Sequence, residues 1–338
     1  MALNIYPFSD EYARITETAR ILGDMGVDAI IVSDMGVLIE LKKLGLKAGI
    51  HISTQANTTS YQAVLAYRDL GAKRVNLARE LSLEQIEKIK HKTKGQIETE
   101  VFIHGAVCFS YSGRCAISDY LAGHGANRGE CKHPCRWKYA LVEETRPGQY
   151  MPVFEDKRGT YLFNSKDVAL FEFVPALKDA GVESIKIEGR MKSIHYIASV
   201  VWFYRQVLDG RRFLPEEGFK LLNRISNRGY SSGFMKGAIN SDDYDVKRSG
   251  SQGESTFVGN TTEDEIGGMR VVQVRNKIYA GEQLEILSPG GSLGMTTMPK
   301  PLKTTDGRHV DLANNPQSIL LEQDIKFKPY TILRRVNL

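Results

Sequence analysis

Four cysteines are the residues of this 338-residue chain with the clearest capacity for chemistry. They are Cys108, Cys115, Cys131 and Cys135, spaced C-x6-C-x15-C-x3-C, and the chain has no other cysteine. Thiolates held together repel one another unless a cation neutralises them, so this grouping predicts a shared metal centre. Two structural alternatives stay open, namely four ordinary buried thiols or a pair of disulfides in a chain without an export signal.

The cysteine spacing alone does not choose the metal. Structural zinc usually takes paired C-x2-4-C turns, and only Cys131 and Cys135 come close to one. Iron–sulfur clusters accept thiolates from more variably spaced loop segments. At this level zinc and an iron–sulfur cluster are equal alternatives.

Around the cysteines, short apolar segments alternate with amphipathic helices over the first two hundred residues. We expect strands at residues 2–6, 28–33, 49–53, 74–77, 96–104 and 183–188. This alternation predicts a parallel sheet covered by helices. An eight-stranded β/α barrel would need two further units. Residues 2–6 and 183–188 are therefore expected to face each other across a gap in the ring.

Polar side chains gather where the expected strands end. Active sites of β/α barrels lie on the loops that follow the carboxyl ends of the strands. His51 and Gln55 lie at such an end and are hard to explain as helix caps, whereas Asp34 is equally well explained as a cap. His104 and Glu188 end two later strands. We expect His51, Gln55, His104 and Glu188 to be catalytic.

Four cations near neighbouring strand ends form a second group of candidates. Arg79, Lys186, Arg190 and Lys192 are expected to bind substrate. Guanidinium groups bind carboxylates through two parallel hydrogen bonds, so this group suits a small dicarboxylate. The structural alternative is an ion pair of Glu188 with Arg190 or Lys186.

The connection over residues 116–160 is far longer than an ordinary βα loop. It carries basic residues next to an aromatic one, such as Arg136 beside Trp137. This combination suits an RNA backbone with a stacked base, and it also suits the shielding of a metal centre from water. We place Arg136 with the substrate-binding residues and favour shielding for Trp137.

Several of these residues also form a known pattern. The chain reproduces E-x-F-x-x-G-A-x-C-x4-G-x-C-x-[LIVM]-S with Glu100, Phe102, Gly105, Ala106, Cys108, Gly113, Cys115, Ile117 and Ser118. This signature resembles that of the collagenase-like peptidase family of unknown catalytic type. Residues 51–57 and 186–193 resemble the same family, and the resemblance covers nearly the whole chain.

The resemblance implies both a fold and a function. The fold is a TIM-like β/α barrel, of which six of eight units are present here, followed by a small C-terminal β-barrel. Two β/α units that precede the first strand in the family are missing from this sequence. The function is that of an iron–sulfur enzyme that hydroxylates the wobble uridine of tRNA with a prephenate-like cosubstrate, and all four cysteines would bind a 4Fe–4S cluster.

Two other functions stay open beside the hydroxylase. One is a collagenase-like peptidase, and the other is a zinc-stapled, non-catalytic RNA-binding protein. The sequence lacks the zinc-protease motif H-E-x-x-H. G-x-S-x-G occurs at 229–233 and 290–294, but neither match lies between an expected strand and an expected helix, as a nucleophile elbow requires.

The character of the sequence changes after the last expected barrel helix. We predict a barrel domain over 1–210 with the cysteine insertion at 105–160, a helical and Gly-rich linker over 211–250, and a β-barrel domain over 251–338. Strands of the last domain are expected at 256–258, 269–274, 283–286, 318–321 and 331–335.

Composition bounds the remaining expectations. Hydrophobic residues make up 42% and charged residues 25%, near globular averages. The start resembles no signal peptide, and no apolar run is long enough to cross a membrane, so we expect a cytoplasmic protein without membrane contact. A net charge of +5 permits a polyanionic partner without demanding one. The expected partners are tRNA and a small dicarboxylate, and a dimer is left open.

Overall fold

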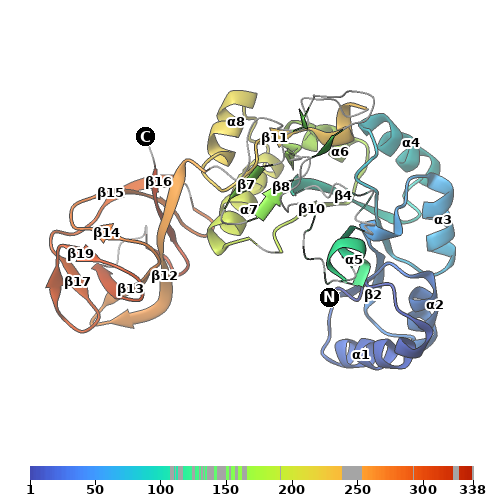
Figure 1. The fold of residues 1–338 in the computed structure, drawn as a ribbon, viewed down its shortest axis with the longest axis horizontal. Helices are drawn as coiled ribbons and strands as arrows, with labels where there is room; N and C mark the ends of the chain where they lie inside the picture. The colour runs from blue at the N-terminus through green and yellow to red at the C-terminus, as the bar shows by residue number, and fades with distance from the viewer. Residues whose placement is uncertain are drawn as a thin grey trace. The chain divides into compact units, whose positions relative to one another are not determined.

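The structure is a computed structural model of the chain (Figure 1). It describes residues 1–106, 110, 112, 117–123, 126–128, 130, 132, 134, 141–142, 150–151, 154–156, 159–161, 166–190, 192–237, 253–291, 293–322 and 327–336. Within these residues, no helix is both long and apolar enough to cross a membrane.

The chain divides into two compact units by its internal contacts. The α/β unit comprises Met1–Glu188 and Arg228–Ser251, and the β unit comprises Gly189–Asn227 and Gln252–Leu338. Each unit is thus built from two separate stretches of sequence. The domain boundaries expected at 210 and 251 stay predictions.

A parallel sheet organises the α/β unit. Its strands, in spatial order, are β1 (Ala29–Val32), β2 (Gly49–Ile52), β3 (Arg74–Asn76), β4 (Glu98–Gly105) and β10 (Ser184–Ile187). Helix α1 (Tyr12–Asp24) precedes β1, and the helices between the strands are α2 (Met35–Leu44), α3 (Tyr61–Asp69), α4 (Leu83–Thr93) and α6 (Val174–Asp179). Figure 1 shows α1 to α4 following one another along the outside of the sheet. The predicted α/β class is confirmed.

The helices begin where short polar side chains satisfy their first N–H groups. Asp34 accepts a hydrogen bond from the Val37 N–H at 2.9 Å and so caps α2. The same carboxylate accepts from the Tyr12 hydroxyl at 2.7 Å, which raises the pKa of Tyr12 to about 12. Ser82 begins α4 with a capping box that involves Gln85. Asp34 is therefore a helix cap, one of the two alternatives that its position left open.

The two faces of the sheet differ in chemistry, because successive side chains of a strand point to opposite sides. On the helix-covered face, Ile30, Ile52, Val75, Val101 and Ile103 are buried. On the other face, register pairs His51 with Arg74, Arg74 with Glu98, and Asn76 with Glu100. One face of the sheet is thus apolar and the other is lined with polar and charged groups.

The amino-terminal segment 2–6, expected as a strand, forms only a bridge between Ala2 and Ile31. Its backbone is nevertheless tied to β1, since Leu3 N donates to Ile31 O at 2.9 Å and Ile31 N donates to Met1 O at 2.8 Å. Among the described residues, β10 pairs only with β4. Direct pairing of residues 2–6 with β10, the outcome that would have contradicted a gap in the ring, is not observed there.

Two short strands join the sheet beyond the sequence prediction. β9 (Asp167–Ala169) pairs antiparallel with the end of β4, and β11 (Tyr230–Ser231) pairs with β9. One hairpin joins β7 (Phe154–Asp156) to β8 (Gly159–Tyr161). A second hairpin joins β5 (Leu141–Val142) to β6 (Tyr150–Met151).

An eight-stranded antiparallel sheet forms most of the β unit. Its order is β16 (Leu293–Thr297), β15 (Gln283–Leu287), β21 (Ile332–Val336), β12 (Ser255–Ile266), β13 (Met269–Val274), β20 (Ser318–Glu322), β17 (Leu302–Thr304) and β18 (His309–Val310). β14 (Ile278–Tyr279) pairs with β19 (Leu312–Ala313). Val258, Val272, Leu284, Ile319 and Leu333 lie in its core. A separate C-terminal β domain is thereby confirmed.

Two helices complete the β unit, α7 (Ile194–Leu208) and α8 (Pro215–Leu222). A buried charge cluster joins them to the strands. Arg334, 2% exposed, donates to Glu285 at 2.6 Å and to the Ser199 hydroxyl at 3.1 Å, and Arg224 pairs with Glu285 at 3.0 Å. His195 Nε2 lies 3.4 Å from Arg334. This cluster explains why residues 189–227 group with the β unit.

Candidate functional site

The polar face of the sheet brings together residues from three strands. The Glu100 carboxylate lies 3.0 Å from Lys186 Nζ, accepts a hydrogen bond from Ser184 Oγ at 2.8 Å and accepts another from Asn76 Nδ2 at 3.1 Å. Arg74 lies 3.7 Å from the same carboxylate. Glu100 of β4 is therefore the shared acceptor for donor groups of β3 and β10.

These contacts fix the charge state of the polar face. Burial alone would raise the pKa of Glu100, but the Lys186 charge, the hydrogen bonds from Ser184 and Lys186, and the Arg74 charge outweigh it and lower the pKa. Burial also holds the pKa of His51 below its usual range, and the charge of Arg74 adds to this effect. Near neutral pH the face thus combines an ionised Glu100 with a neutral His51.

Gln55 lies in the loop after β2, among residues of the amino-terminal segment. Its side-chain oxygen accepts from Asn4 Nδ2 at 2.6 Å, and its backbone oxygen accepts from the Tyr6 hydroxyl at 2.5 Å. The Ser33 hydroxyl lies 3.4 Å from the same side-chain oxygen. These bonds orient Gln55 at the carboxyl end of the sheet, the edge at which the sequence predicts chemistry.

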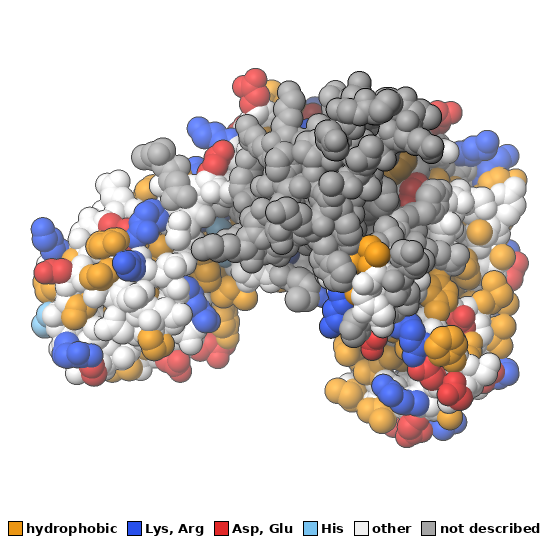
Figure 2. Space-filling model, viewed as in Figure 1, with side chains coloured by type: hydrophobic (Ala, Val, Ile, Leu, Met, Phe, Trp, Pro, Cys, Tyr) orange, Lys and Arg blue, Asp and Glu red, His pale blue; other side chains and the backbone are white. Residues whose placement is uncertain are grey.

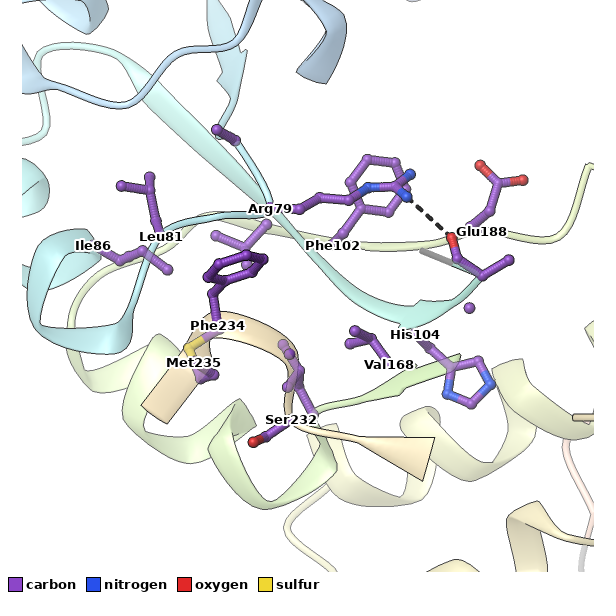
Figure 3. Close-up of a pocket in the computed structure, with 16 residues that line it drawn as sticks. Arg79, Leu81, Ile86, Phe102, His104, Val168, Glu188, Ser232, Phe234 and Met235 are labelled. Carbon is purple, nitrogen blue, oxygen red and sulfur yellow. Dashed lines mark hydrogen bonds between the residues drawn. The ribbon is translucent and has the colours of Figure 1, made fainter. Parts of the chain in front are cut away.

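Arg79 and Lys186 approach one aromatic ring at this edge. The Arg79 guanidinium carbon lies 4.1 Å from the centre of the Phe102 ring, and Lys186 Nζ lies 5.5 Å from it. Arg79 also donates to Ala106 O at 3.0 Å. Figure 3 shows Arg79 lying across Phe102 and reaching toward the end of the pocket where Glu188 lies. Two of the predicted substrate-binding cations thus occur together.

A close backbone contact brings the ends of β4 and β10 together. Gly105 has a φ of +118°, and a Cβ at this position would lie 2.6 Å from Glu188 O. Only glycine tolerates both the backbone conformation and the contact. The first glycine of the signature thereby places Glu188 beside the start of the cysteine segment. Lys186 pairs with Glu100, and the ion pair of Glu188 with Arg190 or Lys186 stays an alternative from the sequence.

His104 differs from the other predicted catalytic residues. It is 1% exposed, and its ring centre lies 5.5 Å from that of Tyr230 on β11. In Figure 3 its imidazole points away from Arg79 and Phe102. His104 therefore lines the same pocket from a separate direction.

The pocket at this edge is small. Its walls include Arg79, Phe102, His104, Val168 and Glu188. About 30 Å³ is open to a water-sized molecule, which is room for roughly one or two waters. A ligand larger than water requires the pocket to widen.

The other predicted cations belong to the β unit or fall outside the described residues. Arg190 and Lys192 belong to the β unit, where Lys192 Nζ lies 4.8 Å from the Tyr196 ring centre. Arg136 lies outside the described residues, as do Cys108, Cys115, Cys131 and Cys135. The predicted metal centre is thus left as a prediction.

Described residues beside the cysteines show how the insertion is tied together. Ser118 is completely buried, and its hydroxyl accepts a hydrogen bond from the Lys132 N–H at 3.1 Å. Arg128 pairs with Glu11, which lowers the pKa of Glu11 to about 2, and stacks 4.6 Å from the Phe8 ring centre. Segments that follow Cys115 and Cys131 in sequence are therefore held side by side.

Sequence reasoning missed one buried ion pair near this edge. Arg228 donates to Asp167 Oδ1 through two nitrogens, at 3.0 and 2.7 Å, and Asp167 is completely buried. The other carboxylate oxygen, Oδ2, has no hydrogen-bond partner in the described part of the chain. Asp167 directly precedes Val168, the register partner of Gly105. No local pattern around Asp167 signals this contact, because its partner lies 61 residues away.

The polar face, by contrast, has a signal in the sequence. Arg74 and Asn76, Glu98 and Glu100, and Ser184 and Lys186 each recur at a spacing of two, which places each pair on one side of a strand. This spacing alone predicts a polar face on the sheet. The signature contains Glu100 but does not indicate that it is the shared acceptor, because that role depends on which strands are neighbours.

Family models match both parts of the chain. Residues 1–244 match Peptidase family U32, and residues 253–334 match the Peptidase family U32 C-terminal domain. The chain belongs to peptidase family U32, the family that the cysteine signature predicts.

Relatives within the family are named for RNA hydroxylation or as a protease. The chain is 33% identical over 341 residues to tRNA hydroxylation protein P of Escherichia coli, covering 88% of this chain and 75% of the relative. It is 32% identical over 343 residues to tRNA hydroxylation protein P1 of Bacillus subtilis, covering 98% and 80%. An uncharacterized protease of Methanocaldococcus jannaschii is 36% identical over 293 residues, covering 83% and 68%. The solved U32 peptidase Mk0906 aligns with a TM-score of 0.35 at 15% identity, over 57% of this chain and 70% of that structure.

Proposed function

We propose that this protein hydroxylates RNA, with a uridine of tRNA as its substrate. The observation that carries the proposal is the similarity to the two bacterial tRNA hydroxylation proteins, because it extends over both units and not over the cysteine signature alone. The wobble uridine as the modified position and a prephenate-like cosubstrate are finer parts of the same proposal, and they come from the family resemblance.

The proposed cofactor is a 4Fe–4S cluster held by Cys108, Cys115, Cys131 and Cys135. Four thiolates and no further cysteine form the donor set of such a cluster. The Ser118–Lys132 hydrogen bond supports this set, because it ties together segments that follow Cys115 and Cys131. When bound, the cluster would supply a redox or Lewis-acid centre beside the carboxyl edge of the sheet.

The proposed role of Arg79 and Lys186 is to bind a carboxylate of the cosubstrate. Both cations lie against the Phe102 ring, so a single carboxylate can contact both of them while they stay packed on that ring. The pocket has to widen beyond its present 30 Å³ for such a ligand. Arg190 and Lys192 stay candidates for a second carboxylate, and Arg136 for a phosphate.

His51, Gln55, His104 and Glu188 are the proposed groups for positioning and proton transfer. The lowered pKa of His51 keeps its ring neutral, so one ring nitrogen has a lone pair that can accept a hydrogen bond or a proton. Gln55 can orient a polar group through its amide, since its oxygen is already fixed by Asn4. Glu188 lines the pocket directly beside Gly105.

Mass spectrometry of tRNA nucleosides tests the function. In an organism that encodes this protein, deletion of the gene is expected to yield a wobble nucleoside one oxygen atom lighter, and reintroduction of the gene restores the mass. Unchanged nucleosides in both strains would contradict the proposal.

Anaerobic purification tests the cofactor separately. We expect about four iron and four sulfide per chain, with the absorbance of an iron–sulfur cluster. Stoichiometric zinc without iron would instead favour the zinc-stapled RNA-binding protein.

A peptidase is the second candidate, and the relative named as a protease favours it. Release of peptide fragments from collagen-like substrates, abolished by substitution of Glu188 and unaffected by removal of tRNA, would support it. The absence of cleavage alongside a changed tRNA nucleoside would exclude it as the main activity.

A further inference from the structure

Glu80 makes a two-point contact with the cysteine segment. It follows β3, one residue after Arg79. Glu80 Oε1 accepts a hydrogen bond from the Ser112 backbone N–H, and Oε2 accepts one from the Ser112 hydroxyl at 2.6 Å. Both acceptors belong to one carboxylate, and hydrogen bonds to a carboxylate are stronger than those between neutral groups.

Ser112 is held in a conformation that serine rarely adopts. Its φ is +45°, in the left-handed region, and the residue is 2% exposed. Such a backbone persists only where its surroundings stabilise it. The two hydrogen bonds to Glu80 provide that stabilisation at one buried point.

Ser112 lies between two of the cysteines in the sequence, so its contact with Glu80 bears on both of them. Ser112 lies four residues after Cys108 and three before Cys115. Arg79, the neighbour of Glu80, holds the other side of Cys108 by donating to Ala106 O at 3.0 Å. Arg79 and Glu80, two consecutive residues after β3, thus bind the chain before and after Cys108.

We propose that Glu80 is a positioning residue: by fixing Ser112, it favours the binding of a shared ligand by Cys108 and Cys115. The cluster part of this inference rests on the proposed function, and the contact itself does not. Four thiolates gain most from a cluster when their loops are ordered beforehand, since less conformational entropy is then lost on binding.

Three substitutions distinguish the effect of the Glu80–Ser112 hydrogen bonds from the effect of the Glu80 charge. Glu80→Ala removes both acceptors. Glu80→Gln keeps the contact without the charge, because the amide oxygen can accept from the Ser112 N–H and the amide nitrogen can donate to the Ser112 hydroxyl. Glu84→Ala is the matched control, since Glu84 is an exposed glutamate in the first turn of α4, four residues further on.

Cysteine alkylation in the metal-free protein is the first measurement. We expect Glu80→Ala to raise the alkylation rate of Cys108 and Cys115 several-fold, with Glu80→Gln and Glu84→Ala near the wild-type rate. Circular dichroism on the same samples confirms that the fold is kept. Equal rates in Glu80→Ala and wild type would overturn the inference, even if the protein never binds iron.

Loss of iron to a chelator is the second measurement, on anaerobically purified protein. Glu80→Ala is expected to lose its cluster at least ten times faster than wild type, and Glu80→Gln to restore most of the retention. Equal retention in Glu80→Ala would contradict the role in cluster binding. A wild type that holds no iron would instead contradict the proposed function, and the alkylation rates would still decide the inference.

Discussion

At the scale of single residues, the signature has a physical explanation apart from the cysteines. Glu100 gathers Lys186, Ser184 and Asn76, whereas Phe102 supports Arg79. The signature therefore includes residues that build the edge of the sheet as well as two of the four cysteines proposed to bind a cluster.

Gly105→Ala tests this explanation most simply. The substituted Cβ would approach Glu188 O to 2.6 Å at a φ of +118°, so we expect a loss of unfolding free energy on the order of 2 kcal/mol or more. Gly95→Ala is the control, because Gly95 also has a positive φ but open space around it, and about 1 kcal/mol is expected there. Urea denaturation of both variants gives the comparison, and equal losses would show that the Glu188 contact contributes nothing.

Glu100→Ala tests the polar face. The substitution leaves Lys186 and Asn76 without their shared acceptor at a site where the Glu100 side chain is 13% exposed, so we expect a loss of about 2 kcal/mol. Glu98→Ala breaks a pair with Arg74 in which the glutamate is 49% exposed, and less than about 1 kcal/mol is expected. A cost of Glu100→Ala no larger than that of Glu98→Ala would contradict the central place of Glu100.

At the scale of elements, the strong strands were predictable and the weak ones were not. Strands β2, β3 and β4 lie within a few residues of the expected ranges, because apolar runs bounded by helix caps mark them. β9 and β11 were missed since they have three and two residues, too few for a period to be read. The segment 2–6 forms a single bridge, although its apolar residues predict a strand.

The packing of α7 in the β unit predicts a pH dependence. Burial, together with the Arg334 charge, lowers the pKa of His195 to about 4, from a usual value of 6.5. The unfolded chain therefore binds more protons than the folded one between these values, so stability is full above pH 6.5 and falls as the pH drops toward 4. The loss amounts to about 3 kcal/mol.

Fluorescence of Trp202 measures this effect, because Trp202 lies on α7 and donates to Gly291 O within the β unit at 3.1 Å. Trp137→Phe removes the other tryptophan from the signal. In that background His195→Phe is expected to flatten the dependence between pH 4 and 6.5. A slope that persists in His195→Phe would assign the titration to another group.

At the scale of the whole molecule, the fold class and the family were predictable from the sequence, whereas the long-range contacts within the β unit were not. Arg334 and His195 are in contact although they lie 139 residues apart in the sequence, and the composition around each residue does not indicate this contact. The predicted active-site cations belong to both units: Arg79 and Lys186 are in the α/β unit, and Arg190 is in the β unit.

The charge on the β unit also bears on the proposed RNA substrate. On the face shown in Figure 2, its Lys and Arg side chains are scattered among hydrophobic and uncharged ones and do not form one broad patch. Binding through a few spaced phosphate contacts predicts a moderate salt dependence. We expect the affinity for tRNA to fall with a slope of log K against log salt of about −2 to −4, measured by filter binding. A slope near zero would exclude a phosphate-based contact.

We propose that a cysteine-bound cluster in this protein supports hydroxylation of tRNA. The most direct measurement is the mass of the wobble nucleoside in a deletion strain that expresses either the wild-type chain or Cys115→Ser. We predict one additional oxygen atom with the wild type and none with Cys115→Ser at equal protein levels. Hydroxylated nucleoside in both strains, or in neither, would contradict the account.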